Sequence, residues 1–241
     1  MRKKTKAEAH YGQTYSYWES RARRYLEEPK QKVLGKVASI LRKKGAAKVL
    51  DVGSGPAHYA IRLVRALGCQ ITCLDFSEKM LTKARENVKK EGLVAAFSFI
   101  RGNILNIKLQ ADSFDAITII SVLHYLLPAD IEAALRKSYA ALQGGGKIIV
   151  VEYWASEKLT ETEKFTLQIA EQNRASQGVK ATFLKEDDYR HLLENVGFEN
   201  VRVGYVRERI YLDKYFEMNP EMRSVCEKHG SIRVAIFEAT K

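Results

Sequence analysis

The sequence has few of the residues that build disulfide-rich or metal-stabilised folds. It contains three cysteines and four prolines in 241 residues, and no two cysteines form a C-x-x-C pair. A sparse and odd cysteine count is typical of a reducing compartment, so we expect a cytoplasmic protein without a disulfide framework or a metal site. Internal repeats, low-complexity stretches and proline-rich linkers are also missing.

The sequence also lacks a long apolar run. The most apolar stretch, residues 116–127, is too short to span a bilayer. No apolar segment follows the basic residues 1–6, so no secretory signal is predicted. With 46% hydrophobic residues the chain can still bury one sizeable core. We expect one main domain at residues 46–241, with insertions near 155–185 and 209–230, and the oligomeric state stays open.

Positive charge is concentrated at the N-terminal end. Residues 1–48 contain 14 Lys and Arg against 4 Asp and Glu, a net +10, whereas the remaining residues contain 26 against 25, a net +1. This distribution predicts a basic N-terminal helical arm or lid at residues 1–45 that attracts an anionic membrane surface or nucleic acid. A solvated surface without any partner explains the same charge.

Residues 48–67 read as a strand, a glycine turn and a helix. The apolar run K-V-L-D-V (48–52) fits a buried parallel strand, G-S-G (53–55) interrupts it, and helical spacing resumes over residues 57–67. Such a turn directs backbone N–H groups and a helix N-terminus toward a ligand, so we expect a small nucleotide-like cofactor. A dinucleotide fingerprint would have a third glycine where His58 stands, which argues against NAD.

A second strand is predicted at residues 70–75 and ends in Asp75. This acid lies about twenty residues beyond the glycine turn, the separation at which a βαβ unit places a carboxylate against ribose hydroxyls. Asp75 together with Ser77 could also cap the next helix, which runs to Lys90, and the two roles are compatible.

The rest of the chain continues the alternation of strands and helices. Buried strands are expected at residues 95–100, 113–121 and 147–152. A helix at residues 131–142 is expected to end at the glycines 144–146. Two late strands, near residues 197–206 and 232–240, follow without a regular helical crossover between them.

These motifs resemble those of the class I S-adenosylmethionine (SAM) methyltransferases. Asp51, two positions before the glycine turn, matches the first motif, with Ala57 in place of the third glycine. The run D-F-S-x-x-M-L from Asp75 matches the second motif, and L-x-G-G-G-K-I-I-V-V continues the pattern, so the resemblance covers residues 47–152 tightly. It implies an α/β fold with a Rossmann-like seven-stranded sheet of order 3-2-1-4-5-7-6, the last strand antiparallel, helices on both faces and an N-terminal helical lid.

The resemblance also implies the cofactor, SAM, with S-adenosylhomocysteine (SAH) as product. Positions after the first four strands would contact it. At the third of these turns the side-chain carbonyl of Asn103 could accept from the adenine amino group, although Gly102-Asn103 is also an ordinary turn dipeptide. The cofactor-binding candidates are Asp51, Gly53, Ser54, Gly55, Asp75, Phe76, Met80, Asn103, Ile104 and Ser121.

The segment after the fourth strand should face the reacting methyl group, because ligands of open parallel sheets bind at the carboxyl ends of the strands. His124 in this segment is the candidate catalytic base, since imidazole titrates near neutrality. A structural histidine, or one that touches only the cofactor, explains the same residue. Aromatic residues are the candidates for the acceptor pocket and lid, with ordinary packing as the alternative: Tyr11, Tyr15, Trp18, Tyr125, Tyr153 and Trp154.

The function implied is methyl transfer from SAM to a small-molecule acceptor at O, N or C. The pattern most resembles the ubiquinone/menaquinone-biosynthesis methyltransferases, which favours an aromatic or isoprenoid acceptor. No (N/D/S)-P-P-aromatic motif or reactive cysteine follows the fourth strand, and this disfavours a nucleobase acceptor. An RNA or protein methyltransferase that uses the basic arm, and a SAM-binding protein without transfer chemistry, remain alternatives.

Overall fold

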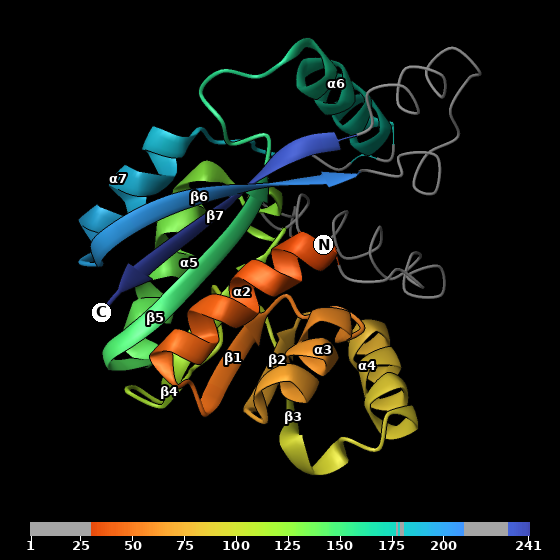
Figure 1. Cartoon of the computed structure of the whole chain (residues 1–241), viewed down its shortest axis with the longest axis vertical. Coiled ribbons are helices and arrows are strands. Elements are labelled where there is room, and N and C mark those ends of the chain that lie inside the picture. The colour runs from red at the N-terminus through yellow and green to blue at the C-terminus, as the bar shows by residue number, and fades with distance from the viewer. Residues whose placement is uncertain (1–29, 177, 179–180, 210–230) are drawn as a thin grey trace, which may run out of the picture.

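The computed structural model describes residues 30–176, 178, 181–209 and 231–241. In these ranges seven strands form one sheet of order β3-β2-β1-β4-β5-β7-β6 (Figure 1). The strands are β1 (Lys48–Val52), β2 (Gln70–Asp75), β3 (Phe97–Arg101), β4 (Phe114–Ile120), β5 (Leu142–Tyr153), β6 (Glu199–Arg209) and β7 (Ser231–Thr240). Strand β7 pairs antiparallel with both of its neighbours, β5 and β6, and the other neighbouring strands pair in parallel. The predicted order and the antiparallel last strand are confirmed.

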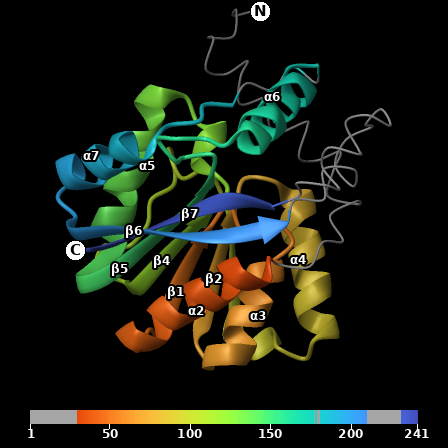
Figure 2. The ribbon, with the colours of Figure 1, turned by 45° about the horizontal axis from the view of Figure 1, so that its top comes forward.

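Helices cover both faces of the sheet (Figures 1 and 2). One face carries α2 (Gln31–Lys44), α3 (His58–Leu67) and α4 (Glu78–Lys90), and the other carries α5 (Pro128–Ala141) and α7 (Glu186–Val196). The sixth helix, α6 (Glu161–Ala175), lies beyond the end of the sheet toward which β1 points. The described residues also form two single turns of 3-10 helix, η1 (Val94–Ala96) and η2 (Leu123–Tyr125). None of the helices in the described ranges is long and apolar enough to cross a bilayer.

Helix α2 belongs to the packed core, although the sequence analysis assigns its residues to the N-terminal arm. Val33, Val37 and Leu41 are fully buried against the sheet and α3. The first turn has no side-chain cap of its own. Instead, the N–H of Val33 donates to the buried carboxylate of Glu208 on β6 (2.9 Å), which satisfies a donor that the helix leaves unpaired and complements the helix dipole.

Much of the basic charge predicted for the N-terminal end lies on and around α2. Residues 30–48 contain seven Lys and Arg and no Asp or Glu. Lys32, Lys36 and Lys43 are exposed, and their spacing of four and seven residues places them along one stripe of the helix. The remainder of the predicted arm, residues 1–29, lies outside the described residues. An anionic partner for this surface stays a prediction.

The glycines at 144–146 were expected to end a helix, and this prediction is wrong. Helix α5 ends earlier, at Ala141, and the glycines lie inside β5. A Cβ on Gly146 would approach the backbone oxygens of Gln143 (2.7 Å) and Asp115 (3.3 Å). The N–H of Gly145 donates to the carbonyl of Lys241 (2.8 Å). The glycines therefore allow β5 to pass closely between β4 and the end of β7, because a side chain at 146 would clash.

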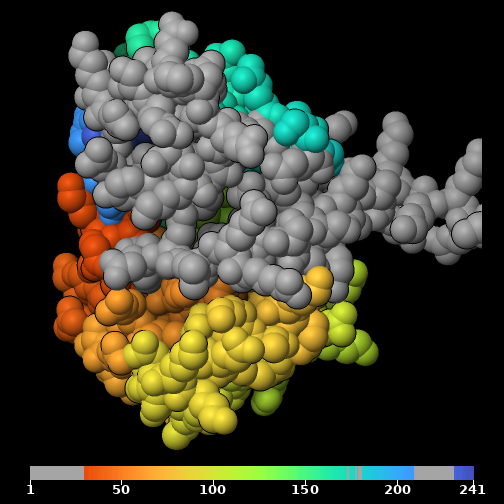
Figure 3. All heavy atoms as spheres, turned by 90° about the vertical axis from the view of Figure 1, so that its right-hand side faces the viewer, coloured from red at the N-terminus to blue at the C-terminus, as the bar shows by residue number. Residues whose placement is uncertain are grey.

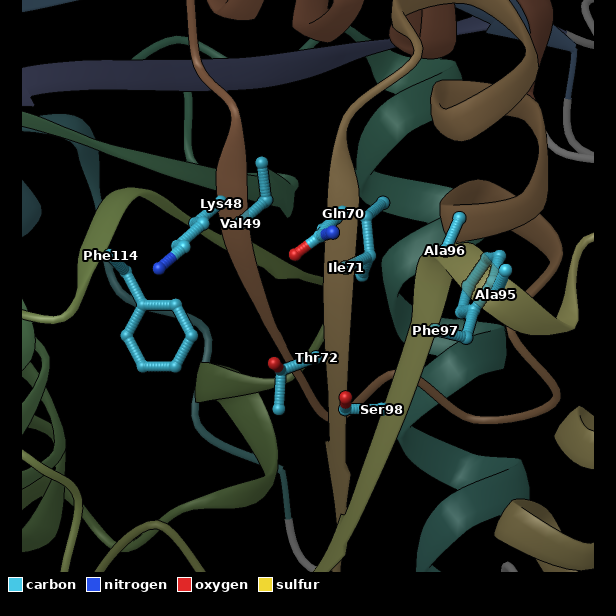
Figure 4. Close-up of a pocket in the computed structure, with 10 residues that line it drawn as sticks. All are labelled: Lys48, Val49, Gln70, Ile71, Thr72, Ala95, Ala96, Phe97, Ser98 and Phe114. Atoms are coloured by element: carbon cyan, nitrogen blue, oxygen red, sulfur yellow. The ribbon is translucent and has the colours of Figure 1, made fainter.

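A shallow hollow of about 240 Å³ lies at the amino-terminal ends of β1 to β4 (Figure 4). It arises because the connection between β3 and β4, residues 102–113, forms no helix and leaves part of that face uncovered. Lys48, Thr72 and Ser98 are among the side chains that line it. Ligands of open parallel sheets bind at the opposite, carboxyl ends of the strands, so this hollow is not the candidate site.

Candidate active site

The turn after β1 has a backbone geometry that lets another group approach its main chain closely. Gly53 and Gly55 have positive φ values of 68° and 53°, which glycine adopts without steric cost. A Cβ on Gly53 would lie 2.4 Å from the Cγ2 atom of Val122, in the segment after β4. No other residue fits at position 53 unless Val122 moves. The hydroxyl of Ser54, between the two glycines, is buried and lies beside the thiol of Cys73 on β2.

Asp75 ties the glycine turn to the second strand. One carboxylate oxygen accepts from the N–H of Gly55 (2.9 Å) and the other accepts from the N–H of Ser77 (2.9 Å). Ser77 in turn caps α4, because its hydroxyl oxygen accepts from the N–H of Met80 (3.2 Å). The predicted capping role therefore falls to Ser77, while Asp75 fixes the turn and lies at the end of β2, where the predicted ribose contact would be.

Asp51 is a buried carboxylate on β1, only 4% exposed. It accepts a hydrogen bond from the hydroxyl of Thr118 on the neighbouring strand β4 (2.7 Å). Burial raises the pKa of Asp51 from 3.8 to about 7, the Thr118 hydrogen bond opposes that rise, and the charge of Asp75 adds to it. Near neutral pH the carboxyl group therefore takes or releases a proton readily in the folded protein.

The turn after β3 is shaped by Asn103. Its side-chain oxygen accepts from the N–H of Leu105 (3.0 Å), and its backbone carbonyl accepts from the N–H groups of Asn106 and Ile107 (2.9 Å each). Ile104 is buried in the core beside β1 and β2. The side chain of Asn103 thus stabilises its own turn, and its predicted contact with adenine stays a prediction.

His124 forms a buried pair with Glu152, the last-but-one residue of β5. Its Nδ1 lies 2.6 Å from Oε2 of Glu152, and the two side chains are 2% and 1% exposed. The other carboxylate oxygen accepts from the N–H of Leu123 (2.9 Å). Because a carboxylate oxygen can only accept, Nδ1 carries the proton of this hydrogen bond, and Nε2 is the ring nitrogen that is left for a further partner. Nε2 is buried and has no hydrogen-bond partner in the part of the chain that the structure describes.

An aromatic cluster surrounds His124. The imidazole ring lies 4.2 Å from the ring of Tyr125 and stacks on Phe183 at 5.3 Å, and Phe183 meets Trp154 edge-on at 5.2 Å. The guanidinium of Arg174 on α6 lies over the rings of Tyr125 (5.4 Å) and Phe183 (5.3 Å). Its Nε also donates to the hydroxyl of Tyr125 (3.2 Å). These five residues are called the aromatic cluster below.

Helix α6 is fixed over this cluster by several contacts. Thr160 and Glu163 form a capping box at its start. Glu163 also pairs with Arg233 on β7 (2.7 Å). Although burial opposes the shift, the hydrogen bonds from Arg233 and the N–H of Thr160 lower the pKa of Glu163 to about 2. The indole N–H of Trp154 donates to the hydroxyl of Thr166 (3.0 Å), so Trp154 links the end of β5 to the helix.

Backbone strain accumulates at this end of the sheet. Ala57, Ser121 and Trp154 follow β1, β4 and β5, and all three have positive φ values, 63°, 58° and 57°. Each such non-glycine residue costs about 1–2 kcal/mol. Strain of this kind is concentrated at functional sites, where the surrounding structure enforces it.

Tyr153 lies beside this strained segment. Burial holds the pKa of its hydroxyl well above the ordinary value of 10.0, the nearby Tyr59 adds to the rise, and a hydrogen bond with Ser121 opposes it. Tyr153 is therefore a neutral hydroxyl at physiological pH.

The structure gathers the described candidates at one end of the sheet. Asp51, the glycine turn, Asp75 with Phe76 and Met80, and Asn103 with Ile104 belong to the half near α3 and α4. Ser121, His124, Tyr125, Tyr153 and Trp154 belong to the half near α6. Figure 3 shows α3 and α4 on one side of this face and α6 on the other. The lid candidates Tyr11, Tyr15 and Trp18 lie outside the described residues. No group of three potential ligands for a metal ion occurs among the described residues.

Sequence reasoning missed three residues of the His124 environment. Glu152 carried a signal, because a carboxylate at the end of the apolar run I-I-V-V is unusual for a buried strand and calls for a partner. No sequence signal pointed to Arg174 and Phe183, because they come close to His124 only through the position of α6 and of the segment that follows it.

The sheet order, the glycine turn and the acid at the end of β2 match the pattern on which the resemblance to the class I SAM-dependent methyltransferases rests. A family described as "Methyltransferase domain" matches residues 49–146. The chain resembles the ubiquinone/menaquinone biosynthesis C-methyltransferase UbiE. It is 35% identical to that of Sinorhizobium fredii over 108 residues, 44% of this chain and 41% of the relative.

A longer but weaker match shows how far the likeness extends. The same-named protein of Bartonella quintana is 26% identical over 170 residues, which cover 64% of this chain and 65% of the relative. The chain thus spans between about two fifths and two thirds of the length of these relatives.

Solved structures share the fold. A putative O-methyltransferase from Nostoc punctiforme superimposes with a TM-score of 0.69 over 93% of this chain and 60% of its own, at 18% identity. Phosphoethanolamine N-methyltransferase 2 of Haemonchus contortus, solved with SAM, superimposes with a TM-score of 0.61 over 84% of this chain and 51% of its own, also at 18% identity. At this level of identity the likeness shows the fold alone.

Proposed function

We propose that this chain transfers the methyl group of SAM to a small-molecule acceptor, with His124 as the general base. The observation that carries the proposal is the buried pair of His124 and Glu152 at the carboxyl end of β4, beside the glycine turn that Val122 packs against. The relatives are named C-methyltransferases of ubiquinone/menaquinone biosynthesis, and this supports an aromatic or isoprenoid acceptor.

The residues present fit the cofactor. The buried hydroxyl of Ser54 offers a hydrogen bond at the turn, and Gly53 leaves room where a side chain would clash. Asp75 would hold the ribose hydroxyls. When bound, SAM supplies a methyl group that is already activated by its sulfonium sulfur.

The protein then has to align the acceptor and remove its proton. Alignment supplies up to about 7–11 kcal/mol in favourable cases, whereas one general base contributes about 10²–10⁴-fold. The proton of the acceptor would pass to Nε2 of His124. Glu152, bonded to Nδ1–H, would stabilise the imidazolium that forms.

Binding of SAH tests the cofactor assignment. We expect SAH to bind in the micromolar range by isothermal titration, and Asp75→Asn to weaken it about tenfold or more, which is about 1.4 kcal/mol. The amide replaces one carboxylate oxygen by an N–H donor, so either the N–H of Gly55 or that of Ser77 would lose its acceptor, and a ribose hydroxyl would meet a donor at that position. Asp115→Asn is the matched control, because Asp115 also accepts two backbone N–H groups (3.0 and 2.8 Å) but lies at the amino-terminal end of β4.

Absence of SAH binding in the unaltered protein would contradict the proposal, and equal affinity in Asp75→Asn would contradict the ribose contact. A SAM-binding protein without transfer chemistry would bind SAH in the same way and release no SAH from SAM with any acceptor. An RNA methyltransferase would incorporate labelled methyl groups into total RNA.

A further proposal concerns the partner of the basic stripe on α2, Lys32, Lys36 and Lys43. The stripe faces solvent, and residues 30–48 contain no acid that would neutralise it, so it suits anionic lipid headgroups. Each lysine near such a surface contributes about 1 kcal/mol, so the triple change to glutamine should weaken binding to vesicles rich in phosphatidylserine about tenfold or more. Co-sedimentation with such vesicles measures this.

The control is the same triple change on α4, at Lys79, Lys89 and Lys90. These lysines are also exposed, but α4 carries Glu78 and Glu86 beside them. Binding that ignores the anionic lipid content, or that both triple variants lose equally, would refute the lipid partner. Retention of an RNA probe in place of vesicles would identify nucleic acid as the partner instead.

A further inference from the structure

The sheet face that carries α5 and α7 changes character at the amino-terminal ends of β1, β2 and β3. The connection between β3 and β4, residues 102–113, forms no helix that would cover this corner. A parallel sheet is normally covered and apolar on both faces. On this face Lys48, Thr72 and Ser98 line the hollow, and alternate residues of a strand point the same way. Two positions after them come the apolar residues that pack with the core: Leu50, Leu74 and Ile100.

The polar side chains of the hollow form two short rows across the strands. Lys48 pairs in register with Gln70, and Thr72 pairs in register with Ser98. Neighbouring strands lie about 4.8 Å apart, and the two rows are two residues, or about 6–7 Å, apart along β2. Figure 4 shows Gln70 and Thr72 between Lys48 and Ser98, with the ring of Phe114 beside Lys48. The four polar groups therefore share one small area of the sheet.

The polar side chains of this area are hydrogen-bond donors with no partner of their own. An ammonium, a carboxamide and two hydroxyls can all donate. None of the four makes a side-chain hydrogen bond or ion pair in the part of the chain that the structure describes. Lys48 is the only charged residue among the described residues that line the hollow. The hollow therefore suits an anion with several acceptor oxygens.

The carboxylate of Asp115, which follows Phe114 in the chain, does not neutralise this arrangement from within. Asp115 is not among the residues that line the hollow. One of its oxygens accepts from the backbone N–H groups of Ala47 and Lys48, at 3.0 and 2.8 Å. Its charge is thus engaged by the main chain at the start of β1.

The size of the hollow sets the size of the ligand. Its volume of about 240 Å³ is about eight times the ~30 Å³ that one water occupies in the liquid, so an oxyanion alone would leave most of it empty. It also lies below the range of about 300–1,000 Å³ that is usual for drug-sized ligands. The rings of Phe114 and Phe97 supply apolar surface on opposite sides (Figure 4). A small molecule with an oxyanion and an apolar part fits these limits.

We propose that this hollow binds a small organic oxyanion, a phosphate ester or a carboxylate, whose apolar part lies against Phe114. The oxyanion accepts from the ammonium of Lys48 and from the hydroxyls of Thr72 and Ser98. The site is separate from the candidate active site, because β1 has five residues and β2 has six, which places the two ends of these strands about 15 Å apart. The oxyanion and the cofactor can therefore bind at the same time.

Four probes test the ligand class: phenyl phosphate, benzoate, phenol and inorganic phosphate. Each is titrated into the ¹⁵N-labelled full chain, with and without SAH, and amide signals are followed by NMR. Phenyl phosphate or benzoate at millimolar concentration should shift the signals of residues 48, 70–72 and 97–98. Phenol lacks the oxyanion and inorganic phosphate lacks the apolar part, so each should bind about threefold or more weakly than the better organic anion. The tighter of phenyl phosphate and benzoate identifies the ligand as a phosphate ester or a carboxylate.

Two substitutions test the donors. Lys48→Gln removes the only charge of the hollow and should weaken the organic anion about threefold or more. Thr72→Val keeps the shape of the side chain, removes the hydroxyl and should weaken it to a similar extent. Lys89→Gln is the matched control, because Lys89 is also exposed but lies on α4, on the other face of the sheet. It should leave the affinity unchanged.

Three results would overturn the inference. The first is phenol binding as tightly as both organic anions, and the second is an unchanged affinity in Lys48→Gln. The third is competition between the organic anion and SAH, with shifts confined to the glycine turn at residues 53–55, since this would place the anion in the cofactor site. Affinity that is the same with and without SAH, and that falls in Lys48→Gln but not in Lys89→Gln, is the expected result.

Discussion

Replacing Glu152 by glutamine is expected to remove most of the proposed methyl transfer and leave the fold intact. The amide oxygen can still accept from the N–H of Leu123, so the amide nitrogen must face Nδ1 of His124. Nδ1 then becomes the acceptor and the ring proton moves to Nε2. A histidine in that tautomer cannot take a proton at Nε2, so turnover should fall about 10²–10⁴-fold.

The tautomer can be observed without knowing the acceptor. In protein labelled with ¹⁵N-histidine, the ring signals of His124 should change from the Nδ1–H to the Nε2–H pattern in Glu152→Gln. His124→Gln identifies those signals among the five histidines. Glu208→Gln is the control, because Glu208 is also a buried carboxylate that accepts a backbone N–H, from Val33, and its change should leave His124 unaffected.

Glu152→Ala tests how much the pair of Glu152 and His124 contributes to the stability of the fold. It removes one member of a buried pair and leaves His124 and the N–H of Leu123 without their acceptor, which should cost about 3–5 kcal/mol. For a chain of this size that cost lowers the melting temperature by about 6–20 °C. Unchanged ¹⁵N signals in Glu152→Gln, with full stability in Glu152→Ala, would mean that Glu152 does not set the state of His124.

The fold was predictable because its signals are local. Each of the first five strands is an apolar run of four to seven residues, and the glycine turn and Asp75 mark the ends of two of them. The prediction for the glycines at 144–146 was wrong because glycine is common both at the ends of helices and where two strands approach closely. Only the approach of Gly146 to Asp115 distinguishes the two uses, and that contact joins residues about thirty positions apart.

The cofactor half of the site could be predicted better than the acceptor half. Asp51, Gly53 and Asp75 follow strands in a fixed order, and strand order alone brings them together. Arg174 and Phe183 come to His124 because α6 folds back over the ends of β4 and β5, held by Glu163 and Trp154. No local sequence pattern predicts that α6 folds back over the ends of these strands.

Replacing Asp51 by asparagine is expected to make the empty protein more stable at pH 8 and to flatten the dependence of its stability on pH. The pKa of Asp51 is about 7 in the folded protein and 3.8 as the ordinary value. The folded state binds the proton of Asp51 more tightly than the unfolded state does. Protonated Asp51 therefore stabilises the fold most below pH 3.8, the pKa in the unfolded chain, and this stabilisation is lost as the pH rises to about 7. The loss is about 1.4 kcal/mol per pH unit, or about 2–3 kcal/mol between pH 5 and pH 7.

Asparagine keeps an acceptor for the Thr118 hydroxyl and has no proton to lose in this range, so the variant should lack that slope. Urea unfolding at pH 5, 6, 7 and 8 measures the difference between the two proteins, which should grow up to pH 7 and then stay constant. Thr118→Val, which removes the hydrogen bond that opposes the shift, should move the plateau to higher pH. Parallel curves for the unaltered protein and Asp51→Asn would contradict the raised pKa.

The same substitution should weaken SAH binding. A buried carboxylate that costs stability in the empty protein is retained where a ligand gains from it, and SAH carries an ammonium group that a charge beside the glycine turn would attract. Affinity for SAH should therefore fall in Asp51→Asn, while the free energy of unfolding rises. If SAH affinity and the free energy of unfolding both rise in Asp51→Asn, the charge of Asp51 stabilises neither the bound cofactor nor the fold. If affinity falls and stability rises, the cost of burying that charge in the empty protein is offset when the cofactor binds.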